Sequence, residues 1–164
     1  MNPATPSSLR KFPAESSIAG PATLSRTRDA RLRKHADYQR VYKATRKQFS
    51  ASMTWFVAAR EASPDSNPPA LKSAVLLAGP RVGLTAGKVL GKAHERNRIK
   101  RRMREAVRRH LEELPDGVDL VLHPRRSVIT MEFVKLEAEV LRIFRQAAAQ
   151  VRAAKASNPS RPGA

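Results

Sequence analysis

The chain has 164 residues, of which 32 are Lys or Arg and 14 are Asp or Glu, so its formal net charge is +18. This length suits one modest domain, and so much positive charge would repel itself in a compact fold unless a polyanion shares it, which makes nucleic acid the leading partner. The sequence has no cysteine, which excludes disulfides, zinc fingers and thiol catalysis, and it has no apolar run of membrane-spanning length.

Three stretches are rich in Pro, Ser and small residues, a composition typical of segments that do not build a core. They are residues 1–30, 61–73 and 153–164. We therefore expect a disordered basic tail over 1–30, one folded domain over 31–152 with a flexible loop at 61–73, and a second disordered tail over 153–164. The first tail lacks the apolar core of a secretory signal, so we expect a cytoplasmic protein.

The first predicted elements are a helix over residues 36–44 and a strand over residues 52–60. The helix has three residues at helical spacing on one face, namely Tyr38, Val41 and Tyr42. In the strand, alternation places Trp55 on an apolar face, where it is expected in the core, and Phe56 on the opposite, more polar face.

Two further strands are predicted at residues 74–78 and 81–87, before a long helix over residues 93–114. The helix pattern ends at Pro115, which cannot continue it. The strand at 81–87 alternates apolar residues with small or basic ones, so one of its faces allows another part of the chain to approach closely.

The last elements are a strand over residues 118–123 and a helix for which Thr130 is the expected N-cap. The order of elements is α-β-β-β-α-β-α. This order predicts an α+β fold, a single-domain sandwich of helices packed on a mixed sheet.

Half of the net charge lies in residues 81–110, which contain eleven Lys or Arg and two Glu. On a helical wheel the long helix keeps one apolar stripe, and most of its remaining surface is Arg. Arg residues one turn apart, such as Arg98 and Arg102, repel each other. A helix that tolerates this repulsion is expected to bind phosphates, for which the planar guanidinium is suited. The alternative is a solvated charged face.

One combination of motifs is specific: an R-x-G-L strand followed by an Arg-Asn-Arg helix. The residues that carry it are Arg81-Val82-Gly83-Leu84-Thr85, Lys88, Gly91, Ala93 and Arg96-Asn97-Arg98-Ile99-Lys100-Arg101, with Arg31-Leu32-Arg33, Asp37-Tyr38 and Val41-Tyr42 upstream. This pattern resembles the signature of the bacterial ribonuclease P protein subunit, over about residues 31–150. Gly87 and Val89 depart from it, because a hydroxyl residue and a second basic residue are common at these positions in the family.

The resemblance implies a ribosomal-protein-like fold and a subunit without catalytic residues of its own. Such a subunit binds a catalytic RNA, and the holoenzyme removes the 5′ leader of precursor tRNA with magnesium ions held by RNA phosphates. We also expect no cofactor or metal bound by the protein, because no carboxylate cluster suggests one, and no protein or membrane partner, because the basic residues do not lie beside an isolated amphipathic helix.

The resemblance also implies site residues, at the positions of this sequence that match the family's motif. The expected contacts to the catalytic RNA are Arg96, Asn97, Arg98, Lys100, Arg101 and Arg104, to which the helical wheel adds Arg102 and Arg108. The leader is expected in a cleft lined by Tyr38, Tyr42 and Phe56, with Arg81 and Lys88 near it. Exposed aromatic side chains are the usual platform for unstacked bases, although a Tyr pair one turn apart is also typical of a core.

Other functions fit the sequence less well. A protein nuclease needs a paired acid and base, and the four His residues are scattered without ligand spacing. A DNA-binding basic helix usually continues into a zipper or follows a short helix-turn, whereas this one follows a strand. A ribosomal or other structural rRNA-binding protein is the closest alternative, because it shares the size, charge and fold style but needs no leader cleft.

Overall fold

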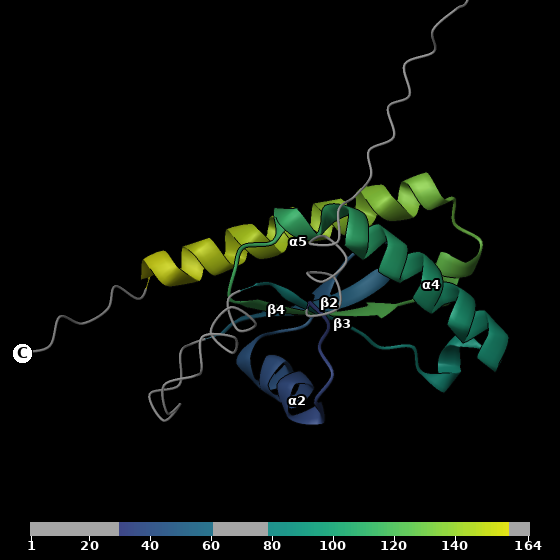
Figure 1. Ribbon diagram of the computed structural model, residues 1–164, viewed down its shortest axis with the longest axis horizontal. Helices are drawn as coiled ribbons and strands as arrows, with labels where there is room; N and C mark the ends of the chain where they lie inside the picture. The colour runs from purple at the N-terminus through teal and green to yellow at the C-terminus, as the bar shows by residue number, and fades with distance from the viewer. Residues whose placement is uncertain (1–29, 61–78, 158–164) are drawn as a thin grey trace, which may run out of the picture.

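In the computed structural model of the protein, the structure describes residues 30–60 and 79–157. Two helices cover one face of a mixed sheet, and a third helix lies on the other face (Figure 1). The helices are α2 (His35–Ala44), α4 (Ala93–His110) and α5 (Phe133–Ser157), with short 3₁₀ turns η1 (Lys88–Leu90), η2 (Leu111–Glu113) and η3 (Arg126–Ile129). The strands are β1 (Gln48–Phe49), β2 (Met53–Ala59), β3 (Arg81–Leu84) and β4 (Val118–Pro124). The α+β prediction is therefore confirmed.

The strands lie in the order β1-β2-β4-β3. β1 and β2 are antiparallel, as are β2 and β4, whereas β3 runs parallel to β4 and is joined to it through α4. The chain before α2 runs along the outer edge of β3, where the Val82 amide donates to Ala30 (2.7 Å) and the Leu32 amide donates to the Val82 carbonyl (3.2 Å). This segment satisfies backbone groups that an open edge would leave unpaired.

One predicted strand lies outside the described residues, and another is shorter than predicted. The predicted strand at residues 74–78 is therefore untested, and β1 is a strand that the sequence did not indicate. β3 ends at Leu84 and not at Gly87. The Thr85 amide still donates to the Leu122 carbonyl (3.0 Å), after which the chain turns into η1.

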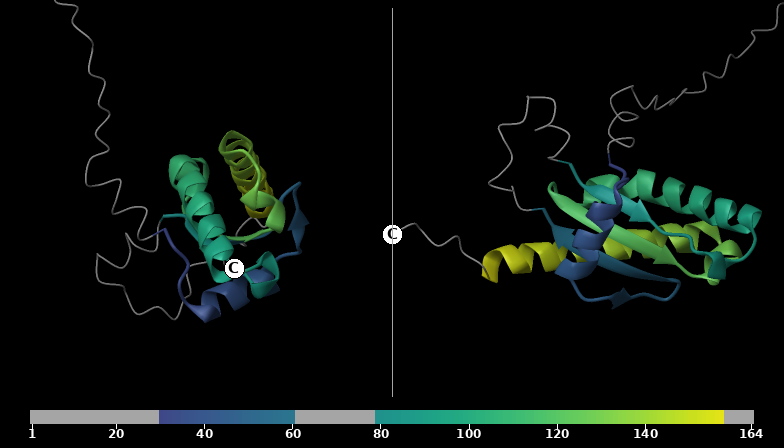
Figure 2. Two further views of the ribbon diagram at one scale, coloured as in Figure 1. Left: turned by 90° about the vertical axis from the view of Figure 1, so that its right-hand side faces the viewer. Right: turned by 90° about the horizontal axis from the view of Figure 1, so that it is seen from below.

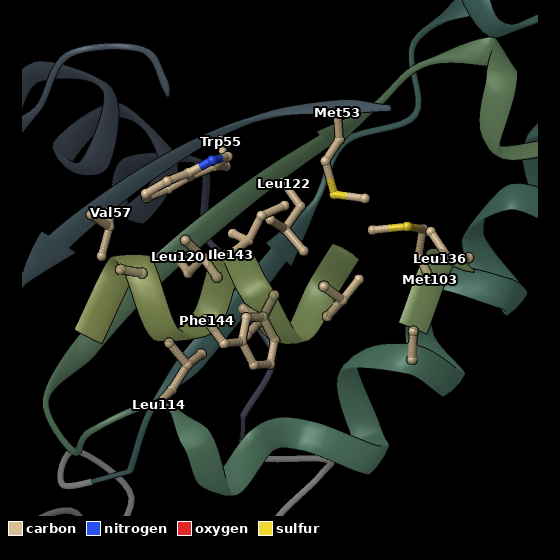
Figure 3. Close-up of a cluster of buried hydrophobic side chains, with 14 of the residues drawn as sticks. Met53, Trp55, Val57, Met103, Leu114, Leu120, Leu122, Leu136, Ile143 and Phe144 are labelled. Atoms are coloured by element: carbon tan, nitrogen blue, oxygen red, sulfur yellow. The ribbon is translucent and has the colours of Figure 1, made fainter. Parts of the chain in front are cut away.

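The main core fills the space between the sheet and the pair α4 and α5, which lie side by side over it (Figure 2). Trp55 is buried there and packs among side chains from both helices and from β4 (Figure 3), so its predicted core position is confirmed. The largest buried partners are Met53, Ile99, Met103, Leu120, Leu122, Leu136, Ile143 and Phe144. This core fixes the position of α4, and with it the direction of the arginine side chains.

The ends of α4 differ in how they are held. At its start, Gly91 has a φ of 116°, which favours glycine, and Glu95 accepts a hydrogen bond from the Lys92 amide (2.7 Å). The predicted helix over 93–114 ends as an α-helix at His110 and continues only as the 3₁₀ turn η2.

Both ends of α5 correct the sequence prediction. Thr130 is not its N-cap, because Thr130 closes the 3₁₀ turn η3, and α5 begins at Phe133. The apolar stripe that begins with Phe133 and Leu136 sets this start. At the other end α5 extends to Ser157, so residues 153–157, which we expected in a tail, are helical.

Glu139 ties α5 to the turn between β1 and β2. Its buried carboxylate accepts hydrogen bonds from the Ser52 amide (2.8 Å) and from the hydroxyls of Ser50 and Ser52. Burial alone would raise the pKa of Glu139, but the hydrogen bonds outweigh burial and hold the pKa below its ordinary value. A charged carboxylate therefore keeps the β1–β2 turn in place.

Candidate RNA-binding surfaces

The helix α4 presents a row of charged side chains that have no partner in the described part of the chain. Arg98, Arg101 and Arg104 are exposed, and Asn97 lies beside them. Within residues 30–60 and 79–157, these three Arg residues have no ion pair or side-chain hydrogen bond, and neither do Arg96 and Lys100. Opposite this row, Ile99, Met103 and Ala106 are fully buried. The predicted division of α4 into a packing stripe and a basic surface is confirmed.

Arg102 differs from its neighbours, because its guanidinium binds the protein backbone. It donates to the carbonyls of Val128, Ile129 (2.8 Å) and Met131. These carbonyls belong to η3 and the residues that follow it, so Arg102 anchors the connection between β4 and α5. The helical wheel predicted that Arg102 contacts RNA. In the structure, its N–H groups instead donate to backbone carbonyls.

The last turn of α4 contains its own counter-charges. Glu105 binds Arg108 (2.7 Å) and Arg109 (3.0 Å), and these hydrogen bonds lower the pKa of Glu105 to about 2. Arg109 also reaches Glu137 on α5 (3.3 Å). Arg108, which we expected to contact RNA, is therefore already paired. The cations of α4 that have no partner among the described residues lie between Arg96 and Arg104, before this paired last turn.

An aromatic cluster, formed by Tyr38, Tyr42, Phe56 and His123, occupies the opposite face of the sheet, beneath α2. The ring centroids of Tyr42 and Phe56 are 5.0 Å apart in an edge-on arrangement, and those of Tyr38 and Tyr42 are 6.4 Å apart. The structure thus brings together the three predicted aromatic residues. All three are half-buried, and they pack on a second, smaller core of Leu32, Val41, Ala58 and Val121.

His123 is a member of the aromatic cluster that the sequence analysis missed. Its ring lies 5.6 Å from those of Tyr42 and Phe56, and its Nε2 is 3.0 Å from the Tyr42 hydroxyl. Burial, together with the charge of Lys47, lowers the pKa of His123, which favours the neutral ring. The alternation of β4 was the signal that could have found it, because His123 shares a face with Val121 and Asp119.

Tyr38 crosses β3 at Gly83, where the strand has no side chain. A Cβ at Gly83 would lie 2.7 Å from the Tyr38 ring, so only glycine lets the ring lie there. The Tyr38 hydroxyl donates to the Leu32 carbonyl (3.3 Å), and burial raises its pKa. The strand face with small residues, which the sequence predicted to allow close approach, is therefore the one that the Tyr38 ring of α2 contacts.

Beside the aromatic cluster, the buried carboxylate of Asp119 binds three arginines, from α2, from β3 and from the residue after β2. Arg81 of β3 forms a double hydrogen bond with it (2.8 and 2.7 Å), Arg40 of α2 contacts it, and Nε of Arg60 lies 3.5 Å away. The bonds to Asp119 raise the pKa of Arg81. Asp37 adds a further contact to Arg81 (3.2 Å).

Arg81 and Lys88, the two cations expected near the leader, differ in their availability. The Arg81 side chain is only 17% exposed and is bound by Asp119 and Asp37, so it positions the elements around the aromatic cluster. Lys88 is exposed on η1, beyond the end of β3.

Neither a membrane span nor a metal cluster is found in the described part of the chain. No helix there combines the length and apolar character needed to cross a bilayer. Among the same residues, no three His, Asp or Glu side chains gather in a way that could hold a metal ion.

Comparisons with known proteins agree with the resemblance. The family model of Ribonuclease P matches residues 27–148. The Ribonuclease P protein component of Chloroflexus aggregans is 39% identical over 118 residues, which are 71% of this chain and 76% of that protein. The one from Finegoldia magna is 39% identical over 69 residues, 42% of this chain and 61% of the relative.

Solved structures show the same fold. The RNase P protein of Staphylococcus aureus aligns with a TM-score of 0.55 at 23% identity, covering 72% of this chain and 94% of that one. The RNase P protein of Thermotoga maritima aligns with a TM-score of 0.56 at 22% identity, covering 71% and 96%. The fold that the resemblance implied is confirmed.

The different uses of neighbouring arginines can be tested by stability. Arg102→Ala should lower the free energy of unfolding by about 1–3 kcal/mol, because carbonyls of the η3 region lose a charged donor. Arg101→Ala should change it by less than about 0.5 kcal/mol, since its side chain is exposed and unpaired. Urea unfolding measures the free energy of unfolding of both variants. If both changes are equally small, Arg102 does not stabilise the fold and again becomes a candidate RNA contact.

Proposed function

Because this chain belongs to the ribonuclease P family of protein components, we propose that it binds two RNAs on two separate surfaces. Helix α4 binds the catalytic RNA of the ribonucleoprotein, and the aromatic cluster binds the 5′ leader of precursor tRNA. The holoenzyme then removes the leader by endonucleolytic cleavage. The observation that carries this proposal is the set of exposed, unpaired Arg side chains on α4, opposite an aromatic surface.

On α4, the proposed RNA contacts are the cations that have no partner within the described protein. They are Arg96, Arg98, Lys100, Arg101 and Arg104, with Asn97 among them. Phosphate oxygens accept paired hydrogen bonds from guanidinium, and they relieve the repulsion between arginines on adjacent turns. Arg102 and Arg108 are left out of this set because their donors are engaged within the protein.

In the aromatic cluster, the half-buried rings of Tyr38, Tyr42 and Phe56 suit unstacked bases. Base stacking on aromatic side chains is tolerant of sequence, because every base has a flat face. Such a surface fits a leader whose sequence varies among precursors. The exposed Lys88 on η1 supplies a phosphate contact nearby, while Arg81 acts indirectly by holding α2 and β3 together.

For the chemical step, we propose that the protein supplies no catalytic group. Magnesium held by RNA phosphates supplies the reaction chemistry in the holoenzyme, and the protein positions the RNA. The donor set supports this, since the described residues gather no carboxylate cluster for a metal. We propose a cytoplasmic location, with which a chain without cysteine is compatible.

Reconstitution tests the proposal directly. The purified chain alone should leave precursor tRNA intact, and it should increase cleavage by the cognate catalytic RNA most strongly at low magnesium, where protein cations replace part of the screening. Cleavage rates are measured across a magnesium series with and without protein. The proposal is wrong if the protein gives no stimulation at any magnesium concentration, or if the RNA-free protein cleaves.

Arg98→Ala tests the role of α4. It should weaken binding to the catalytic RNA and reduce the slope of log affinity against log salt by about one, because one phosphate contact is lost. Filter binding at several salt concentrations gives both values. Arg152→Ala, an exposed position near the end of α5, removes the same charge elsewhere and should leave the slope unchanged. If both variants change the affinity and the slope equally, α4 contributes only net positive charge and is not a specific contact surface.

Phe56→Ala tests the aromatic cluster. Within the holoenzyme it should weaken binding of precursor tRNA by about fivefold or more, the effect of losing one base stack, while mature tRNA binding stays constant. Phe56→Leu keeps the apolar contacts with the small core but lacks the ring, so it should show the same selective loss. Equal losses on precursor and mature tRNA would assign Phe56 to packing alone.

A further inference from the structure

Phe49 is an aromatic residue that belongs to neither hydrophobic core in the described part of the chain. It lies on the edge strand β1 and is 66% exposed. The Nζ of Lys47 lies 5.4 Å from the centroid of its ring, and Arg46 beside it is also exposed. An exposed ring next to exposed cations has the composition of a single-stranded RNA contact.

The register of the sheet places Phe49 on the same face as the aromatic cluster. Phe49 pairs with Thr54, and Thr54 pairs with His123. Opposed residues of antiparallel strands lie on the same face, so Phe49 and His123 are two strand spacings apart, about 10 Å. Lys47 lies near enough to His123 for its charge to lower the pKa of that ring. The basic edge therefore continues directly into the aromatic cluster.

The short strand β1 is held firmly for an element of two residues. The Ser50 amide donates to the Met53 carbonyl (2.9 Å), and the Ser50 hydroxyl binds the buried carboxylate of Glu139. Glu139 also binds Ser52, at the other end of the same turn. Phe49 is thus presented by a fixed turn, so little ordering is needed when a base stacks on it.

We propose that Phe49 and Lys47 form a second nucleotide subsite, at which one base of the precursor leader stacks on Phe49 and its phosphate meets Lys47. The subsite rests on the proposed function, because it extends the surface that Tyr38, Tyr42 and Phe56 provide. The occupant is single-stranded, since a ring lying across the edge of a sheet reaches only an unpaired base. Its phosphate complements the cations around the ring.

The test compares leaders that differ in length by one nucleotide, bound to the reconstituted holoenzyme. With the unaltered protein, affinity should rise by about fivefold when the leader becomes long enough to reach Phe49. Phe49→Ala and Phe49→Leu should abolish this rise, because neither presents a flat aromatic face, and Phe49→Tyr should retain it. Val134→Ala, at an apolar side chain on α5 that is 75% exposed, is the matched control and should behave as the unaltered protein.

The outcomes separate this subsite from the proposed function. If Phe49→Ala keeps the stepwise rise while Phe56→Ala still loses precursor selectivity, the subsite is wrong and the proposed function stands. If Phe49→Ala weakens mature tRNA or the catalytic RNA as much as precursor, the base on Phe49 does not come from the leader and the subsite is wrong. If neither Phe49→Ala nor Phe56→Ala affects precursor selectively, the leader-binding role itself fails.

Discussion

The arrangement of the aromatic face depends on one buried carboxylate. Asp119 has no solvent exposure and is bound by arginines from α2, from β3 and from the residue that follows β2. A buried charge is tolerated only where such partners compensate for its lost hydration. Since Arg40 comes from α2, the network fixes where that helix crosses the sheet, and therefore where Tyr38 and Tyr42 lie. The surface proposed for the leader is thus positioned by an ion network beside it.

The arginines of this chain differ in what they bind, and their position in the sequence motif does not reveal this difference. Arg98, Arg101 and Arg104 on α4 have no partner among the described residues, whereas Arg102 on the same helix holds the backbone near η3, and Arg81 holds α2 and β3 through carboxylates. A net charge of +18 therefore overstates what the folded surface offers to a polyanion. The unpaired arginines of α4 point outward, because the opposite side of the helix packs on the core.

Local patterns predicted much of the fold. Periodicity identified α2, α4 and α5, because each buries one regular face, and short apolar runs identified β2 and β4, which are buried on both faces. It could not find β1, since two residues have no period, nor the start of α5, where η3 intervenes before Phe133. Of the candidate site, the aromatic residues and the basic helix were predictable. The use of Arg102 and Arg81 and the position of His123 depend on contacts between distant segments, which no local pattern encodes.

The antiparallel pair β2 and β4 lies at the centre of the sheet, yet one strand precedes α4 and the other follows it. Pairing such distant segments requires closing a long loop. The chain loses the entropy of this loop before the strand contacts compensate for the loss, which slows folding. Helices need only local contacts and form far sooner. We therefore expect the basic surface of α4 to exist before the sheet closes, so that catalytic RNA can meet a nascent chain and the aromatic face is completed last.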